Sequence, residues 1–91
     1  MSTPMPGRRG RIARRFRLRD LHVFSAVAHA GSMGKAAAEL GVTQPAVSKA
    51  IADLEAAVGR PLLDRGRHGV APTPYGEAVL RRGAEAFAAL E

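Results

Sequence analysis

A small group of polar and compact residues could make specific contacts with a partner: Gln44, Pro45, Ser48 and Lys49. Apolar residues in the same stretch recur at i, i+4, i+7 and i+11, which predicts one buried helical stripe: Val47, Ile51, Leu54 and Val58. The first group therefore faces outward near the start of a predicted helix. Its amide, hydroxyl and ammonium groups form hydrogen bonds, so we expect recognition rather than catalysis.

Neither catalysis nor metal binding is indicated elsewhere in the sequence. The chain has no Cys, which excludes disulfides and cysteine-based metal sites. His22 and His29 share a helix face but stand two turns apart, about 10 Å, too far for one ion, and His68 lies far downstream. No Gly-rich phosphate loop and no spaced Ser/His/Asp set supports an enzyme. We expect no cofactor, and Asp20, Asp53 and Glu55 are predicted to face solvent or to cap an element.

The elements that position the outward-facing group form a helix-turn-helix. Ser32 is predicted to cap a short helix, because its hydroxyl can accept a free backbone N–H. Gly41 marks a tight turn, and Thr43 is predicted to cap a second, longer helix with Pro45 in its first turn. Two helices of unequal length joined by a glycine turn are typical of the motif whose second helix enters the DNA major groove.

A preceding helix is predicted from Leu18 to Ala30, and Gly31 is expected to end it. Its buried face is predicted from helical spacing to comprise Leu18, Leu21, Phe24, Ser25 and Ala28, with Val27 beside them. This helix is expected to pack across the helix-turn-helix.

Residues 62–72 are predicted to form a small β-hairpin. Gly59 caps the long helix and Pro61 prevents its continuation. Two short extended segments, 62–64 and 70–72, flank a basic turn at 65–69. Beside a helix-turn-helix we interpret this hairpin as a wing that touches sugar-phosphate or the minor groove, through Arg65, Arg67 and His68. An ordinary solvated loop is the alternative.

A last helix is predicted to begin after Thr73, its cap, with Pro74 in the first turn. Its apolar stripe comprises Tyr75, Val79, Leu80, Ala84, Phe87 and Leu90. The stripe could fold back on its own domain, but a second copy of the helix would cover it more economically. We therefore expect a dimer helix, in an N-terminal piece of a longer protein.

The net charge of +6 is unevenly distributed. Residues 1–17 contain six arginines and no acid, namely Arg8, Arg9, Arg11, Arg14, Arg15 and Arg17, whereas residues 18–91 have eight basic and eight acidic residues. We expect the tail to be disordered, either as a solvated leader or as a flexible arm on DNA. No apolar run approaches the roughly 20 residues of a membrane span, so a cytoplasmic protein is expected.

The ordered set of motifs resembles the N-terminal DNA-binding domain of LysR-type transcriptional regulators. The resemblance covers about residues 18–91, and it is carried by L-x-x-F-x-A-V-A-x-x-G-S (21–32), K-A-A-x-x-L-G-V-T-Q-P-A-V-S-K-A-I (35–51), L-E (54–55), G-R-P-L-L-D-R (59–65) and G-V-A-P-T-P-Y-G (69–76).

The resemblance implies a mainly α fold with a disordered basic tail at 1–17, a winged helix-turn-helix at 18–73 and a linker/dimerisation helix at 74–91. Such proteins normally continue into a ligand-sensing domain, assemble further at full length and bind interrupted dyads, so DNA, a second copy and a small-molecule effector are the expected partners. Base-reading roles are implied for Gln44, Pro45, Ser48 and Lys49. Backbone contacts are implied for Ser32, Lys35, Thr43, Arg65, Arg67 and His68, and dimer contacts for Tyr75, Val79, Leu80, Phe87 and Leu90. Many relatives have Arg at the position of Lys49.

Two function classes follow from these patterns. The first is sequence-specific double-stranded DNA binding for transcriptional control. The second is a winged-helix module that mediates dimerisation or protein contacts without reading DNA. The two predicted caps, the exposed group at the start of the second helix and the basic wing favour the first class.

Overall fold

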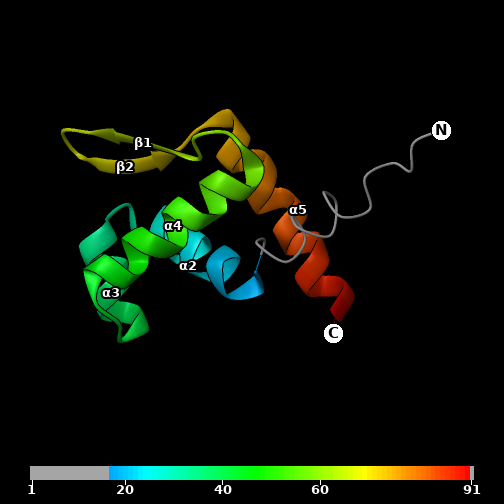
Figure 1. Cartoon of the computed structure of the whole chain (residues 1–91), viewed down its shortest axis with the longest axis horizontal. Coiled ribbons are helices and arrows are strands. Elements are labelled where there is room, and N and C mark those ends of the chain that lie inside the picture. The colour runs from blue at the N-terminus through cyan, green and yellow to red at the C-terminus, as the bar shows by residue number, and fades with distance from the viewer. Residues whose placement is uncertain (1–16, 91) are drawn as a thin grey trace.

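The computed structural model describes the backbone of residues 17–90 and the side chains as far as Gly83. In chain order the described elements are α2 (Leu18–Ala30), α3 (Met33–Leu40), α4 (Gln44–Val58), β1 (Leu63–Gly66), β2 (Gly69–Pro72) and α5 (Pro74–Leu90). Figure 1 shows α2, α3 and α4 gathered into one body, the hairpin lying along one side and α5 leading away. The predicted winged helix-turn-helix is confirmed, while residues 1–16, most of the predicted tail, lie outside the described residues.

The helix-turn-helix forms through the predicted caps. Ser32 Oγ accepts a hydrogen bond from Lys35 N at 3.1 Å, and Thr43 Oγ1 accepts one from Ala46 N at 3.2 Å. Each bond satisfies a first-turn N–H that has no partner within its helix. Gly41 has φ 70°, a left-handed conformation that glycine adopts without a Cβ clash. The turn at Gly41 and the cap at Thr43 therefore set the angle at which α4 leaves α3.

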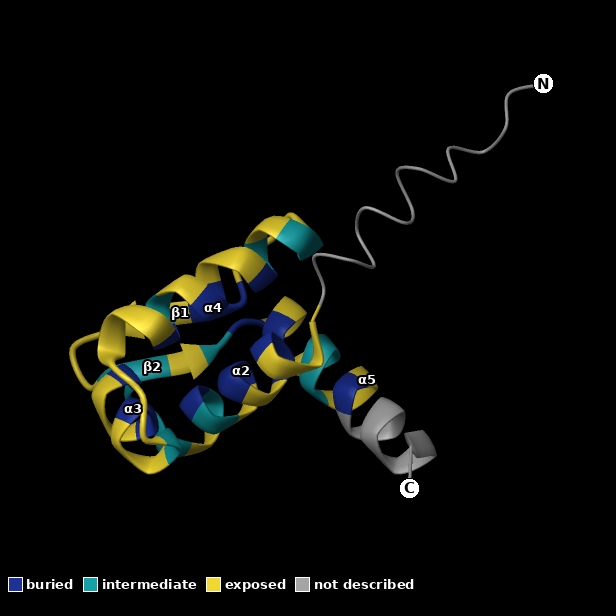
Figure 2. Ribbon diagram, turned by 60° about the horizontal axis from the view of Figure 1, so that its bottom comes forward, coloured by how far each residue is buried: buried dark blue, intermediate teal, exposed yellow. Residues whose placement is uncertain are grey.

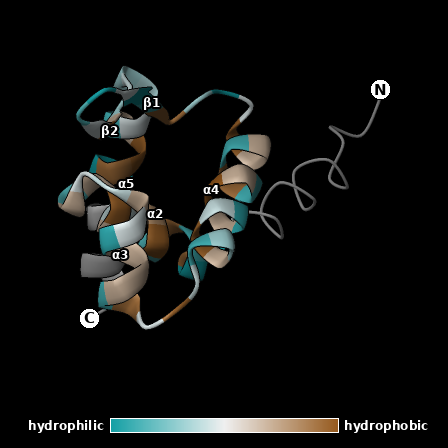
Figure 3. Ribbon diagram, turned by 90° about the vertical axis from the view of Figure 1, so that its left-hand side faces the viewer, coloured by the Kyte–Doolittle hydropathy of each residue, from teal (hydrophilic) through white to brown (hydrophobic). Residues whose placement is uncertain are grey.

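The core lies between α2 and the helix-turn-helix. Its largest fully buried side chains are Phe24, Val27, Val47, Ile51, Leu54 and Leu62. Figure 2 shows α4 with its buried residues turned toward α2 and its exposed residues turned outward. Figure 3 shows the same division by hydropathy, with hydrophobic residues on the facing sides of α2 and α4. Burial of this stripe fixes which face of α4 remains available to a partner.

The predicted buried face of α2 was partly wrong. Leu18 is 50% exposed and Ser25 is also exposed, whereas Val23 is buried beside Leu21 and Phe24. Leu18 and Ser25 stand seven residues apart, so they lie on the same side of the helix, where Ser25 lines an open hollow with residues of β2 and α5. Because α2 packs against both helices, its buried face is centred on Phe24 and Val27 instead.

The wing is a two-stranded antiparallel hairpin with the register Leu63↔Pro72 to Gly66↔Gly69. The predicted turn at 65–69 was too long, because Arg65 pairs with Val70 and Gly66 with Gly69. Strand pairing therefore continues to the residues on either side of Arg67 and His68. Val70 N donates to Gly31 O at 3.1 Å, which ties the hairpin to the end of α2.

Two polar side chains join the wing to the helices. Glu55 Oε2 accepts from Leu62 N at 2.8 Å and from Leu63 N at 3.4 Å. Thr73 Oγ1 accepts from Gly76 N at 3.0 Å, as the predicted cap of α5, and donates to Pro61 O at 2.8 Å. Both side chains satisfy backbone groups between α4 and α5, and so hold the wing at a fixed place on the domain.

The start of α5 packs on its own domain. Val79 and Leu80 are half-buried against the core, while Tyr75 is 48% exposed with the Arg60 guanidinium 5.1 Å from its ring centroid. Part of the predicted stripe thus folds back, as the alternative to a dimer helix required. The side chains of Ala84, Phe87 and Leu90 lie outside the described residues. Among residues 17–90, no helix is both long and apolar enough to cross a membrane.

Candidate nucleic-acid interface

The first two turns of α4 present the predicted contact group. Gln44, Pro45 and Lys49 are exposed, and Ser48 is half-buried. They lie away from Val47, which is fully buried. The Thr43 cap begins the helix directly before them. The structure therefore brings all four predicted residues together at one helix end.

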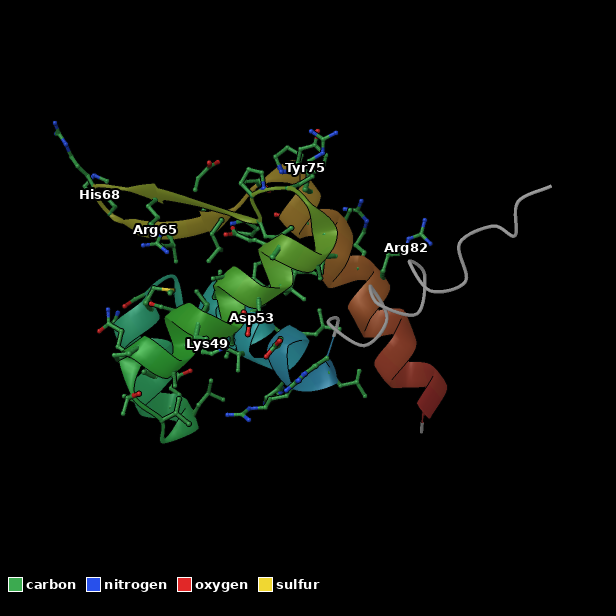
Figure 4. The ribbon with its side chains drawn as sticks, in the orientation of Figure 1. Lys49, Asp53, Arg65, His68, Tyr75 and Arg82 are labelled. Carbon is green, nitrogen blue, oxygen red and sulfur yellow. The ribbon has the colours of Figure 1, made fainter. Side chains whose placement is uncertain are left out.

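Lys49 is engaged in an ion pair one helical turn further along α4. Its Nζ lies 2.9 Å from Asp53 Oδ2, and the two side chains are 76% and 50% exposed. Figure 4 shows both on the same stretch of α4. The prediction that Asp53 faces solvent is confirmed. The pair itself was missed, although a Lys and an Asp four residues apart in a predicted helix are the usual signal for one.

A second group of polar residues lies where α3 and α4 begin. Lys35 is exposed, and the hydroxyls of Ser32 and Thr43 accept from backbone N–H groups. Each hydroxyl retains its own O–H as a donor. The three residues can thus offer two hydroxyl donors and one ammonium to an anionic surface such as a phosphate chain.

The wing carries the third group. Arg65, Arg67 and His68 are exposed on the hairpin. Figures 1 and 4 show the wing tip, with His68, at the same end of the domain as α3 and the start of α4. The hairpin therefore adds basic side chains beside the exposed face of α4.

Asp20 was predicted to face solvent or to cap an element, and it does not face solvent, because it is only 7% exposed. It lines a hollow between α2 and α4 together with Arg17, Arg19, Ala46, Lys49, Ala50 and Asp53. Burial, and then the negative charge of Asp53, raise the pKa of Asp20 above its usual value, while Arg17, Arg19 and Lys49 act in the opposite direction. The helical spacing did carry a signal for this burial, because Asp20 stands four and seven residues before the buried Phe24 and Val27; its charge was given more weight than its position.

The three histidines do not converge on one site. His22 and His29 are exposed on α2, and His68 is exposed on the wing. In the described part of the chain, no group of three or more His, Cys, Asp or Glu side chains could hold a metal ion.

Comparison with known proteins identifies the family. Residues 18–77 match the bacterial regulatory helix-turn-helix protein, lysR family. This chain belongs to that family. Residues 18–77 are accordingly a LysR-type helix-turn-helix DNA-binding domain, and the resemblance found in the sequence is confirmed.

Curated relatives of the chain are named as regulators. The chain is 46% identical over 69 residues to the uncharacterized HTH-type transcriptional regulator YdcI of Escherichia coli (strain K12), which covers 76% of the chain and 22% of YdcI. It is 52% identical over 62 residues to the HTH-type transcriptional regulator TdcA of the same strain, covering 68% of the chain and 20% of TdcA. The chain thus spans about a fifth of the length of these relatives, both of which are named as transcriptional regulators.

Solved LysR-type domains have the same fold. The domain in the CbnR_DBD–DNA complex matches with a TM-score of 0.77 and 36% identity, covering 81% of the chain and 85% of that domain. The BenM_DBD/benA site 1 DNA complex matches with a TM-score of 0.76 and 35% identity, covering 81% of the chain and 86% of that domain. Both matched structures contain DNA.

Proposed function

We propose that this LysR-type domain binds double-stranded DNA sequence-specifically and thereby regulates transcription. In this proposal α4, about residues 44–58, lies in the major groove and the wing at 62–72 lies on the backbone or in the minor groove. The observation that carries the proposal is the exposed polar end of α4 beside a basic wing. The DNA present in the two matched domain structures supports it.

The residues at the start of α4 would read base edges. The Gln44 amide matches the paired donor and acceptor of adenine, and Pro45 can contact a thymine methyl. Lys49 can donate to guanine O6 and N7, although an ammonium lacks the planar fork of an arginine. Ser48 has a short side chain and is half-buried. It would therefore contact only a base pair directly beneath the helix.

Phosphate contacts would fix the register of α4 in the groove. Ser32, Lys35 and Thr43 offer hydroxyl and ammonium donors at the starts of α3 and α4. Arg65, Arg67 and His68 would contact the backbone from the wing. These contacts carry no sequence information, so their loss would weaken all duplexes alike.

We further propose that the protein acts as a homodimer on an interrupted dyad, in the cytoplasm and on the nucleoid. Two-fold symmetry in the protein matches two-fold symmetry in the operator. The dimer contact would be made by α5, through Tyr75, Phe87, Leu90 and those parts of Val79 and Leu80 that packing on their own domain leaves exposed. A small-molecule effector would act through a ligand-sensing domain, which in the relatives would lie in the part of their length that this chain does not match.

A winged helix that only mediates protein contacts is the alternative function. It would not require exposed hydrogen-bonding side chains at the start of α4 or arginines on the wing. Binding assays separate the two functions, because only the DNA reader distinguishes one duplex from another of equal length.

The first test is selection of bound sequences from a random duplex pool, read at two salt concentrations. Lys49→Ala is expected to lose roughly 1–3 kcal/mol of discrimination at one base pair. Lys35→Ala is expected to weaken every duplex alike and to reduce the salt slope by about one. Unchanged affinity of both variants for every duplex would refute this placement of α4 and α3.

The second test concerns the dimer. Replacing Phe87 and Leu90 together with Asp is expected to give monomers in sedimentation, because two buried charges would oppose an apolar helix contact. Glu77→Gln, an exposed change in the first turn of α5, serves as the control and is expected to leave the assembly unaltered. Intact dimers of the double variant would contradict the assignment of α5.

A further inference from the structure

Lys49 and Asp53 form an ion pair whose contribution to helix stability is small. Both side chains are at least half exposed, and exposed pairs of this kind contribute little because water and salt screen them. The order along α4 is Lys before Asp, the less favourable one for a helix dipole. Stability therefore gives little reason for this pair, but its geometry places a carboxylate directly on the ammonium of a proposed base-reading residue.

The surroundings of Lys49 on the side of α2 include both acidic and basic side chains. The hollow that Lys49 lines also contains the carboxylates of Asp53 and of the buried Asp20, together with Arg17 and Arg19. The two carboxylates are near enough to influence each other, since the charge of Asp53 raises the pKa of Asp20. Lys49 thus shares the hollow with two carboxylates of its own domain and is in direct contact with that of Asp53.

We propose that Asp53 is a specificity-determining residue that positions Lys49 and opposes its non-specific contacts with phosphate. This inference rests on the proposed DNA-binding function. A lysine ammonium is a point charge on a flexible stem, so a free Lys49 would be attracted to any nearby phosphate. With Asp53 beside it, the ammonium must exchange a carboxylate partner for each new acceptor.

The exchange favours a matched base over a phosphate. Guanine offers two acceptors, O6 and N7, on the floor of the major groove, and these can replace the carboxylate of Asp53. The ammonium leaves Asp53 for either acceptor, but a phosphate at the rim of the groove is an anion that the freed Asp53 carboxylate repels, whereas the guanine acceptors carry no net charge. The pair therefore weakens binding to unmatched DNA more than binding to a site with guanine in register.

The test compares the chain with Asp53→Asn, Lys49→Ala and the double variant. The probes are a duplex selected by the original chain, the same duplex with single base-pair changes, and an unrelated duplex of equal length. Affinities are measured by fluorescence anisotropy at two salt concentrations. Asp53→Asn is expected to raise the affinity for the unrelated duplex. It should lower the ratio of the affinity for the selected duplex to that for the unrelated duplex about two- to fivefold, the range typical of an exposed ion pair. In the Lys49→Ala background the same change is expected to leave the ratio unaltered.

The matched control is Glu39→Gln, which removes one exposed negative charge from α3. This variant is expected to raise the affinity for all duplexes by one common factor. Asp53→Asn behaving like this control would overturn the inference, and so would a change of base preference that persists without Lys49, because Asp53 would then read a base itself. A parent chain that binds every duplex alike would overturn the proposed function together with this inference, whereas an unchanged ratio on a discriminating parent would overturn the inference alone.

Discussion

Removal of the Glu55 carboxylate is expected to loosen the wing and destabilise the domain. Glu55 lies on α4, one residue beyond the buried Leu54, and its Oε2 accepts from Leu62 N at 2.8 Å and Leu63 N at 3.4 Å. It therefore connects the helix proposed to read DNA with the strand that begins the wing. Glu55→Ala removes the acceptor, and Glu55→Gln keeps a neutral acceptor of the same shape.

The expected loss of folding stability follows from the two hydrogen bonds that Glu55 accepts. A hydrogen bond to a charged group contributes about 1.5–3 kcal/mol net, against about 0.5–1.5 kcal/mol for a neutral one. The bond to Leu63 is near the outer limit of bonding distance and adds little. We therefore expect a loss of about 2–3 kcal/mol for Glu55→Ala and about 1 kcal/mol for Glu55→Gln. A domain of this size has a free energy of unfolding of about 5–10 kcal/mol in all.

The assay is urea unfolding followed by circular dichroism, together with amide hydrogen exchange. At a slope of about 1–2 kcal/mol per molar urea, Glu55→Ala should lower the midpoint by about 1–3 M, with Glu55→Gln between it and the original chain. Exchange at the Leu62 amide should accelerate in both variants. Glu39→Ala, at an exposed acid of α3, should change stability by less than about 0.5 kcal/mol. A Glu55→Ala midpoint equal to that of this control would refute the reasoning.

Two further variants test other contacts. Asp20→Asn should raise the free energy of unfolding at neutral pH, because burial and Asp53 raise the pKa of Asp20. The folded state then binds a proton at Asp20 more tightly than the unfolded state does, so the original chain loses stability as pH rises from the usual Asp pKa through the raised one. The urea midpoints of the two proteins should therefore differ at neutral pH and converge at low pH. Equal midpoints at every pH would exclude the effect. Gly76→Ala should cost about 1–3 kcal/mol, since a Cβ there would collide with the Leu62 carbonyl and press on Phe24 and Pro72. Gly66→Ala, where a Cβ meets open space, is the matched control in thermal unfolding, and equal losses in both variants would contradict the steric argument.

Periodicity and capping chemistry were enough to predict the helices. The bounds of α2 and the caps at Ser32, Thr43 and Thr73 were predicted correctly, because a cap depends on residues within one turn of it. The wing was located for a similar reason, since Gly59 and Pro61 must end α4. The turn of the wing was predicted too long, because Arg65 pairs with Val70 across the two strands and the local sequence at either residue does not predict this pairing.

The errors concern contacts between elements. Leu18 was assigned to the core from its type and spacing, but burial depends on where α3 and α4 cross α2. Asp20 was assigned to solvent or to a cap because of its charge, and it is buried beside residues of α4. The role of Glu55 in holding the wing was equally hidden, because its hydrogen-bond partners lie seven and eight residues away across a change of direction. The residues proposed to read DNA were predicted, whereas those that position them were only partly so.

The placement of acids also resolves the apparent conflict between charge and function. Residues 18–91 have no net charge, which by composition alone does not favour a polyanionic partner. The fold removes two carboxylates from the exposed surface: Asp20 is buried, and Glu55 is half-buried and accepts hydrogen bonds from backbone N–H groups. Lys35, Arg65 and Arg67 meanwhile remain exposed. A neutral sequence can thus present a basic surface, because potential at a binding face depends on which charges reach it. Among the described acids that stay exposed, Asp53 is the one in contact with a proposed base-reading residue, and this is the reason that we assign it a role in specificity.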